Sequence, residues 1–247
     1  MKIKGLGVAM VTPFNNDLSV DFDSLEKLTE SLVVGGVDFL VVMGTTGEAA
    51  TLTIQEKNEV LSHVINTNAG RIPVVYGIGG NNTWAVCEEL KSFDTKGVSA
   101  ILSASPGYNK PTQEGIFQHF KALGEVSPLP IILYNVPGRT GSNVEAETCI
   151  RIANEVPNIV AVKEASGDLN QIEEHPVLVS FVSFQFFLVY HAFYVFYTLA
   201  VNVHGFFSIL FRPMLLNVDF LGATNDEPCL VNILQKHVEL LYSSQEW

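Results

Sequence analysis

The chain has 247 residues, 47% of them hydrophobic, which is enough to bury one large α/β core or two small ones. Its 26 acidic and 14 basic residues give a formal net charge of −12, which repels phosphate backbones and argues against a nucleic-acid partner. Cys87, Cys149 and Cys229 are odd in number and widely spaced, which is typical of free thiols in a reducing cytoplasm.

The chain begins with a short basic stretch but no apolar run typical of a secretion signal, which also favours the cytoplasm. From residue 5 to about 170, apolar runs rich in β-branched residues alternate with stretches of helical period. The runs expected as strands are 7–14, 37–43, 72–80, 98–103, 130–135 and the one ending at Lys163. Helices are expected from Asp21 or Asp23, around 60–65, and over 81–95, 113–126 and 145–155.

Six strand-then-helix units spaced by roughly 25 to 30 residues predict a parallel sheet covered by helices. A doubly wound sheet and a (β/α)8 barrel both fit this alternation. The loops after strands are rich in Gly, Pro, Thr, Tyr and Asn, and a barrel places its active site at these loops. No GxGxxG or Walker sequence follows the first strand, which disfavours nucleotide binding. We therefore predict an α/β protein with a single (β/α)8 TIM-barrel domain over residues 1–247.

The composition changes beyond about residue 174. Residues 176–211 contain nine phenylalanines and no Asp, Glu, Lys or Arg. The part at 186–201 is about long enough to test as a membrane span, but its flanks lack Lys and Arg and the barrel needs two buried strands from this region. We therefore expect no membrane segment. A frame-shifted gene segment is another hypothesis for this tract, which resequencing would test.

The sixth run brings a lysine to the end of a buried strand. Four apolar residues lead directly into Lys163, so its ammonium would enter a largely apolar interior. Desolvation there lowers the pKa and makes the neutral, nucleophilic amine accessible near pH 7, as a Schiff-base enzyme requires. The alternative is that Lys163 carries its charge from the strand end to the surface.

Two other strand ends carry groups suited to this chemistry. The turn Gly44-Thr45-Thr46-Gly47 offers backbone N–H groups and two hydroxyls for a small carboxylate, unless it is merely a connecting turn. Tyr134 ends the strand before that of Lys163 and can pass protons during carbinolamine formation and collapse. Alternatively, its ring packs in the barrel and its hydroxyl bonds to the backbone.

Two loop residues are weaker candidates. Arg139 could hold a substrate carboxylate in bidentate fashion, although most loop arginines are only solvated. Tyr108 is more typical of an aromatic that packs its loop. The six histidines show no metal-ligand spacing, and no metal site is predicted.

Four segments together resemble the dihydrodipicolinate synthase family of pyruvate-dependent class I aldolases, a superfamily that includes N-acetylneuraminate lyase. Any one segment alone would be weak, but four in order between residue 3 and about 174 are highly specific. They are Gly44-Thr45-Thr46-Gly47-Glu48, Tyr-Asn-Lys-Pro at 108–111, Tyr-Asn-Val-Pro-Gly-Arg-Thr-Gly at 134–141 and Val-Lys-Glu-Ala-Ser-Gly at 162–167.

The resemblance implies roles for the candidate residues. Lys163 would form the Schiff base with pyruvate, whose carboxylate Thr45 and Thr46 would bind. Tyr134 would donate and accept protons, relayed through the Thr45 hydroxyl to Tyr108 of a neighbouring subunit.

The resemblance also implies the second substrate. Arg139 would bind the carboxylate of aspartate semialdehyde, and the Arg-Thr-Gly ending of its loop favours the synthases over the neuraminate lyases. The pyruvate enamine would attack the aldehyde, and the adduct would cyclise to 4-hydroxy-tetrahydrodipicolinate on the way to lysine. The expected protein is a cytoplasmic homodimer or homotetramer without metal or organic cofactor. Alternatives are a pyruvate-dependent aldolase acting on a sugar acid, such as N-acetylneuraminate lyase or a keto-deoxy sugar acid aldolase, and a non-catalytic homologue.

The departures from the family lie in residues 175–247. The family's Ser-Gly-Asp-Asp stretch at the seventh strand is lost, with Val189-Tyr190-His191-Ala192 in the nearest register. Residues 202–209 resemble the approach to the eighth strand but carry bulky Phe206 and Phe207. Phe207 would lie against the substrate, and overpacking there would cost about 1–3 kcal/mol. Members of the family continue into a C-terminal helical region, for which we expect too little chain to remain.

Overall fold

The computed structural model describes residue 3, residues 5–168 and residues 170–171, all within one compact unit, Met1–Phe184. The expected seventh and eighth strands, the tract at 176–211 and Phe207 lie outside the described residues. A single domain over the whole chain therefore stays a prediction.

Six parallel strands form one sheet whose spatial order follows the chain. The strands are β1 (Gly7–Ala9), β2 (Phe39–Val42), β3 (Val74–Gly77), β4 (Ala100–Ala104), β5 (Ile131–Asn135) and β6 (Ile159–Glu164). A doubly wound sheet reverses its strand order at a switch point, whereas the order of the described strands never reverses. The sheet therefore matches six consecutive units of a (β/α)8 barrel, as predicted.

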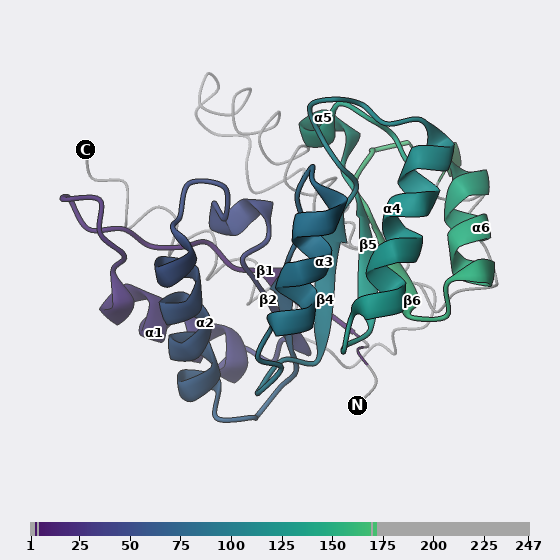
Figure 1. Cartoon of the computed structure of the whole chain (residues 1–247). Helices are drawn as coiled ribbons and strands as arrows, with labels where there is room; N and C mark the ends of the chain where they lie inside the picture. Colours follow the sequence, from purple (N-terminus) through teal and green to yellow (C-terminus); the bar gives the residue numbers. More distant parts are fainter. Residues whose placement is uncertain (1–2, 4, 169, 172–247) are drawn as a thin grey trace, which may run out of the picture. The chain divides into compact units, whose positions relative to one another are not determined.

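The helices follow the strands at nearly the predicted positions. They are α1 (Phe22–Val34), α2 (Ile54–Asn68), α3 (Thr83–Ser92), α4 (Gln113–Val126), α5 (Pro137–Thr140) and α6 (Ala146–Glu155). Figure 1 shows α3, α4 and α6 side by side over one face of the sheet, and α1 packs against α2. Asp21 caps α1 by accepting a 2.9 Å hydrogen bond from the Ser24 N–H.

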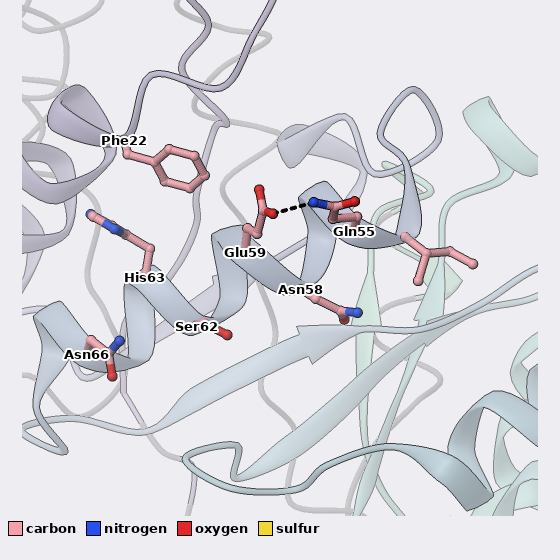
Figure 2. Close-up of a pocket in the computed structure, with 8 residues that line it drawn as sticks. Phe22, Gln55, Asn58, Glu59, Ser62, His63 and Asn66 are labelled. Atoms are coloured by element: carbon pink, nitrogen blue, oxygen red, sulfur yellow. Dashed lines mark hydrogen bonds between the residues drawn. The ribbon is translucent and has the colours of Figure 1, made fainter.

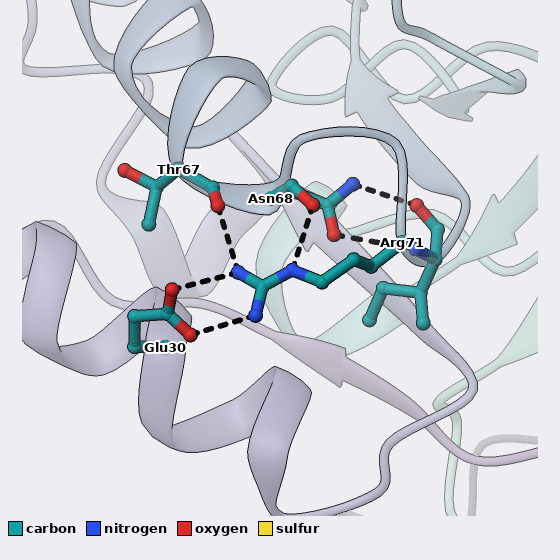
Figure 3. A network of polar contacts seen from close by, with 5 residues as sticks. Glu30, Thr67, Asn68 and Arg71 are labelled. Atoms are coloured by element: carbon teal, nitrogen blue, oxygen red, sulfur yellow. Dashed lines mark hydrogen bonds and ion pairs between the residues drawn. The ribbon is translucent and has the colours of Figure 1, made fainter.

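One arginine fixes the end of α2 to α1 (Figure 3). The two terminal nitrogens of Arg71 donate to the two carboxylate oxygens of Glu30, each at 2.8 Å. The same guanidinium donates to the carbonyls of Thr67 and Asn68 at the end of α2. This bidentate pair closes the turn that leads into β3.

Side chains alternate between the two faces of the sheet. One face carries a buried cluster of nine residues: Phe39, Val41, Val75, Ala100, Leu102, Ile132, Tyr134, Val136 and Ala161. We call this the inner face, and the helices cover the other. Because Lys163 follows Ala161 by two residues it shares the inner face, whereas Glu164 shares the helix-covered face with Val162.

The pairing of β5 with β6 contains a register shift. Ile131 lies opposite Ile159, but the next residue, Ile132, lies opposite Ala161. Val160 is therefore an extra residue, as in a β-bulge, and it is 39% exposed. Beyond it the register is regular.

No helix in the described part of the chain is long and apolar enough to cross a membrane. The stretch at 186–201 lies outside that part.

Candidate active site

The register sets Lys163 directly opposite Tyr134. The Lys163 Nζ lies 4.2 Å from the centroid of the Tyr134 ring, and the lysine is half-buried. Burial, and secondarily the positive charge of Arg139, lowers the pKa of Lys163 from 10.5 to about 8. With that pKa, about a tenth of the amine is neutral at pH 7. The alternative, in which Lys163 takes its charge to the surface, is wrong.

Tyr134 connects the lysine to the turn after β2. Its ring is buried, and its hydroxyl lies 3.3 Å from the Thr45 Oγ1, where either oxygen can donate the hydrogen bond. The ring packs in the inner cluster, as the alternative interpretation expected, but within the described residues the hydroxyl has this side-chain partner and no backbone partner. Lys163, Tyr134 and Thr45, which come from three separate strand ends, form one continuous group as the barrel prediction requires.

The turn that carries Thr45 is a short 3₁₀ helix, Thr45–Gly47. The N–H groups of Gly47 and Glu48 donate to Gly44 and Thr45 carbonyls, at 3.1 and 3.2 Å. These two donors are used inside the turn, so the expected run of backbone donors is shorter than predicted. Within the described residues, the N–H groups of Thr45 and Thr46 make no hydrogen bond. Thr46 is exposed.

A close backbone approach holds this turn at the end of the sheet. A Cβ added to Gly77, at the end of β3, would lie 2.0 Å from the carbonyl oxygen of Met43. Only glycine fits there without displacing the backbone. On the other side, the Thr12 hydroxyl donates to the carbonyl of Gly47 at 2.7 Å. The loop after β1 and the end of β3 therefore support the turn from both sides.

Arg139 lies in α5, although the sequence predicted a plain loop at 136–141. Pro137 starts this single turn because its fixed φ suits a first helical residue, and Gly141 ends it at φ 73°. The Arg139 side chain is exposed and makes no ion pair within the described residues. Its charge nevertheless acts on Lys163. Because α5 directly follows β5, whose Tyr134 lies opposite Lys163, the two cations lie at the same end of the sheet.

Tyr108 is 92% exposed, so it does not pack its own loop. Its backbone N–H donates to the Thr140 carbonyl at 3.1 Å, and a Cβ on Gly107 would lie 3.2 Å from the Thr140 Cα. The loop after β4 therefore rests on α5 through its backbone, while the phenol points away. In the described part of the chain, Tyr108 makes no hydrogen bond to Thr45.

Sequence reasoning missed two buried polar residues beside the candidate site. Asn135 is 0% exposed and Glu164 is 6% exposed, and each directly follows a candidate residue in its strand. The signal was present, because two consecutive polar residues at a buried strand end must point to opposite faces. Only one of the pair Lys163 and Glu164 was considered.

A shallow surface depression on α2 lies apart from this group (Figure 2). Its lining residues are Phe22, Ile54, Gln55, Asn58, Glu59, Ser62, His63 and Asn66. The rings of Phe22 and His63 lie 5.2 Å apart, and Gln55 donates to Glu59 at 2.8 Å. None of the predicted site residues lines it. Within the described ranges, no cluster of three or more His, Cys, Asp or Glu residues could hold a metal ion.

Residues 2–185 match the model of the dihydrodipicolinate synthetase family. The chain is 53% identical over 174 residues to the 4-hydroxy-tetrahydrodipicolinate synthase of Parabacteroides distasonis, covering 70% of this chain and 59% of the relative. It is 55% identical over 167 residues to the synthase of the same name from Flavobacterium psychrophilum, covering 68% of this chain and 57% of the relative. The match thus spans less than two thirds of these relatives.

Solved structures give the same result. The chloride-inhibited dihydrodipicolinate synthase of Acinetobacter baumannii, complexed with pyruvate, superposes with a TM-score of 0.69 at 43% identity, covering 73% of this chain and 63% of that one. The enzyme of Cyanidioschyzon merolae with lysine bound gives a TM-score of 0.68 at 42% identity, covering 72% and 63%. This chain is a member of the dihydrodipicolinate synthetase family.

Proposed function

We propose that this chain is a 4-hydroxy-tetrahydrodipicolinate synthase that condenses pyruvate with aspartate semialdehyde through a Schiff base on Lys163. The observation that carries the proposal is the half-buried amine over the Tyr134 ring, with the Tyr134 hydroxyl 3.3 Å from Thr45. A neutral amine and a proton-transferring phenol at one strand end are what imine formation needs.

In the first stage the neutral amine of Lys163 adds to the ketone carbon of pyruvate. The ketone oxygen takes a proton and becomes the hydroxyl of a carbinolamine. Tyr134 then protonates this hydroxyl, which leaves as water as the C=N bond of the imine forms. Tyr134 is left as a phenolate that can take a proton in the next stage, and Thr45, beside it, can relay a proton between the phenol and a further donor.

In the second stage the imine loses a proton from its methyl group to the Tyr134 phenolate and becomes an enamine. The enamine carbon forms a bond with the aldehyde carbon of aspartate semialdehyde, and the aldehyde oxygen takes a proton. The amino group of the same substrate then attacks the imine carbon and displaces the Lys163 amine. This closes the ring and frees the enzyme.

The two substrates carry carboxylates, and the site has suitable partners for both. The N–H groups and hydroxyls of Thr45 and Thr46 would hold the carboxylate of pyruvate. The guanidinium of Arg139 would hold that of aspartate semialdehyde, in the bidentate geometry that arginine favours. The synthase name of the relatives supports this acceptor over a sugar acid.

We further propose that the protein works in the cytoplasm as a homodimer or homotetramer in which Tyr108 completes a neighbouring site. The support is its 92% exposed phenol on a loop whose backbone is anchored to α5. Sedimentation of the full chain would show a dimer or tetramer, and Tyr108→Phe should slow turnover while leaving that assembly intact. A monomer with full activity would contradict this arrangement.

The proposed function is tested by trapping the imine. The full chain is incubated with pyruvate and borohydride, which reduces an imine irreversibly, and its intact mass is measured with Lys163→Ala as the control. A single pyruvate-sized adduct that is lost in the variant is expected. A folded protein that forms no adduct would instead be a non-catalytic member of the family.

The acceptor is tested separately by turnover. With pyruvate present, consumption of aspartate semialdehyde but not of N-acetylmannosamine is expected. The reverse preference would assign the chain to the sugar-acid aldolases.

A further inference from the structure

Glu164 follows Lys163 directly but lies on the opposite, helix-covered face of the sheet. Its buried carboxylate accepts hydrogen bonds from three donor groups. The Asn135 Nδ2 lies 3.1 and 3.0 Å from the two carboxylate oxygens, the Gln171 Nε2 lies 3.0 Å from one of them, and the Ser166 N–H lies 2.7 Å from the other. An ionised carboxylate only accepts hydrogen bonds, so it suits a position where three donors converge.

The network continues from Asn135 into the start of α6. The Asn135 Oδ1 accepts from the Val144 N–H at 3.0 Å, and its Nδ2 also lies 2.8 Å from the Asn143 Oδ1. The Asn143 Nδ2 donates to the Gln171 Oε1 at 2.6 Å, which returns the network to Glu164. This set of amides and one carboxylate therefore joins the ends of β5 and β6 to the segment before α6.

The same pair also fixes the backbone between the two strands. The Ala165 N–H donates to the Asn135 carbonyl at 2.8 Å, so the ladder continues one residue past Glu164. Asn135 and Glu164 are opposite each other in the register, as are Tyr134 and Lys163 immediately before them. Each strand end thus carries one residue in the hydrogen-bond network and one residue in the candidate site. Because these residues are consecutive in the chain, a shift of Asn135 or Glu164 also displaces Tyr134 or Lys163.

We propose that Glu164 is a positioning residue that, through Asn135, Gln171 and Ser166, holds the ends of β5 and β6 so that the Lys163 amine stays over the Tyr134 ring. The inference rests on the proposed function, because it requires Lys163 to be the Schiff-base lysine. Glu164 itself does not touch the substrate. Its carboxylate is needed because the isosteric amide of glutamine would direct hydrogens at donors that already fill the site.

The test compares Glu164→Gln with Asn158→Ala. Asn158 anchors the opposite end of β6, where its side-chain amide donates to the carbonyls of Gly124, Ser127 and Leu129. Both variants lose side-chain hydrogen bonds at one end of β6, but only Glu164 lies at the end that carries the candidate site. The readout is the initial rate of borohydride-trapped adduct formation with pyruvate, as a function of pH, on proteins shown to be folded by circular dichroism.

Glu164→Gln should slow trapping by about 10- to 100-fold, because a displacement of the amine of about 1 Å is enough to cost such a factor. Asn158→Ala should change it by less than about threefold. The midpoint of the pH profile should also move upward in Glu164→Gln, because a displaced Lys163 is better solvated while Arg139 and Tyr134 are unchanged. Loss of a nearby negative charge alone would move it downward.

The outcomes separate the two proposals. Equal rates in Glu164→Gln and Asn158→Ala, or a midpoint that moves downward, would overturn the positioning role while leaving the Schiff base intact. A wild-type protein without adduct would overturn the proposed function, and this inference with it. If Glu164→Gln does not fold, Gln171→Ala removes one donor from the edge of the network. It should slow trapping by about 3- to 10-fold, and an unchanged rate would refute the proposal.

Discussion

Lys163 faces Tyr134 across the β5–β6 pair, with its Nζ 4.2 Å from the centre of the ring. The amine is thereby held against an aromatic surface rather than in water, and its pKa is lowered to about 8. The structure therefore links a strand register to the protonation state of one side chain.

The first prediction is the pH profile of imine formation. Because only the neutral amine attacks, the initial trapping rate with pyruvate should rise about tenfold per pH unit below pH 8 and level off above it. Stopped reactions with borohydride across this range, followed by intact-mass measurement, give the midpoint. A midpoint near 10.5, the ordinary value, would show that Lys163 is solvated.

The second prediction is that Lys163 costs stability. The pKa of Lys163 is lower in the folded protein than in the unfolded chain. Below pH 8 the buried ammonium therefore lowers the free energy of unfolding by its full desolvation cost, and this cost disappears as the pH rises toward 10.5. Lys163→Met should therefore raise the free energy of unfolding at pH 7 by about 1–3 kcal/mol, allowing for partial exposure. The gain should shrink toward pH 10.5. Urea unfolding measures it, and Lys91→Met, at an exposed lysine paired with Glu88, should show no such gain.

The third prediction concerns the Tyr134 hydroxyl. Tyr134→Phe keeps the ring in the inner cluster but removes the proton relay, so turnover should fall by about 10²- to 10⁴-fold. The free energy of unfolding should change by only about 1 kcal/mol, because one hydrogen bond to Thr45 is lost. Tyr76→Phe is the matched control, since Tyr76 is equally buried but stacks on Phe93 at 5.2 Å under the helices. Comparable loss of turnover in both variants would contradict the relay.

The fourth prediction separates the two effects of Arg139. Arg139→Ala should raise the KM for aspartate semialdehyde by about 10-fold or more, because a charge-assisted bond to its carboxylate is lost. It should also move the trapping midpoint upward, since the positive neighbour of Lys163 is removed. Arg139→Lys should restore the midpoint but not the KM, because lysine lacks the planar fork.

Steady-state kinetics and trapping measure the two effects independently. Arg151→Ala is the control, because that arginine pairs with Glu114 and Glu155 on the exposed surface of α6. Neither KM nor midpoint should respond to it. An unchanged KM in Arg139→Ala would remove this residue from the substrate site.

The fifth prediction concerns acid. His119 is 2% exposed, and burial lowers its pKa from 6.5 to about 4. Between pH 6.5 and 4 the histidine is protonated in the unfolded chain but neutral in the folded protein. The free energy of unfolding is therefore highest above pH 6.5 and falls by about 3 kcal/mol as the pH drops toward 4. His119→Asn can keep the 2.8 Å contact to the Thr83 hydroxyl but has no group that titrates in this range. Its free energy of unfolding should therefore fall less over the same pH range than that of the wild type. Urea unfolding at pH 6.5 and pH 4 measures the two changes. An equal fall in the free energy of unfolding in the wild type and in His119→Asn would contradict the role of His119.

Much of the fold was predictable because the apolar runs and caps are local signals. The helix Gln113–Val126 begins and ends where the sequence indicated, since Thr112 caps it and apolar residues recur at helical spacing. The short helix at Pro137 was missed because one turn has no periodicity to detect. Its Pro and Gly were read as loop residues although they also mark the two ends of a helix.

The candidate site was predictable residue by residue, but not its geometry. The order of strand ends suggested that Thr45, Tyr134 and Lys163 meet. The exposure of Tyr108 depends on tertiary packing, and the use of the Gly47 N–H depends on the 3₁₀ conformation of its turn. Glu164 was overlooked because its partners, Asn135 and Gln171, are 29 and 7 residues away. Such a network leaves no periodic trace in the sequence.

The extra residue at Val160 has a consequence for how this site can vary. If pairing ran on regularly from Ile131 and Ile159, Tyr134 would face Val162, and Lys163 would turn its amine toward the helices. The direction in which the nucleophile points is therefore set by a count of residues at the far end of its strand. Loss of the bulge with Val160 retained would leave all the reactive side chains in the sequence and yet place the amine on the wrong side of the sheet, whereas deletion of this valine would make the pairing regular and keep Lys163 opposite Tyr134.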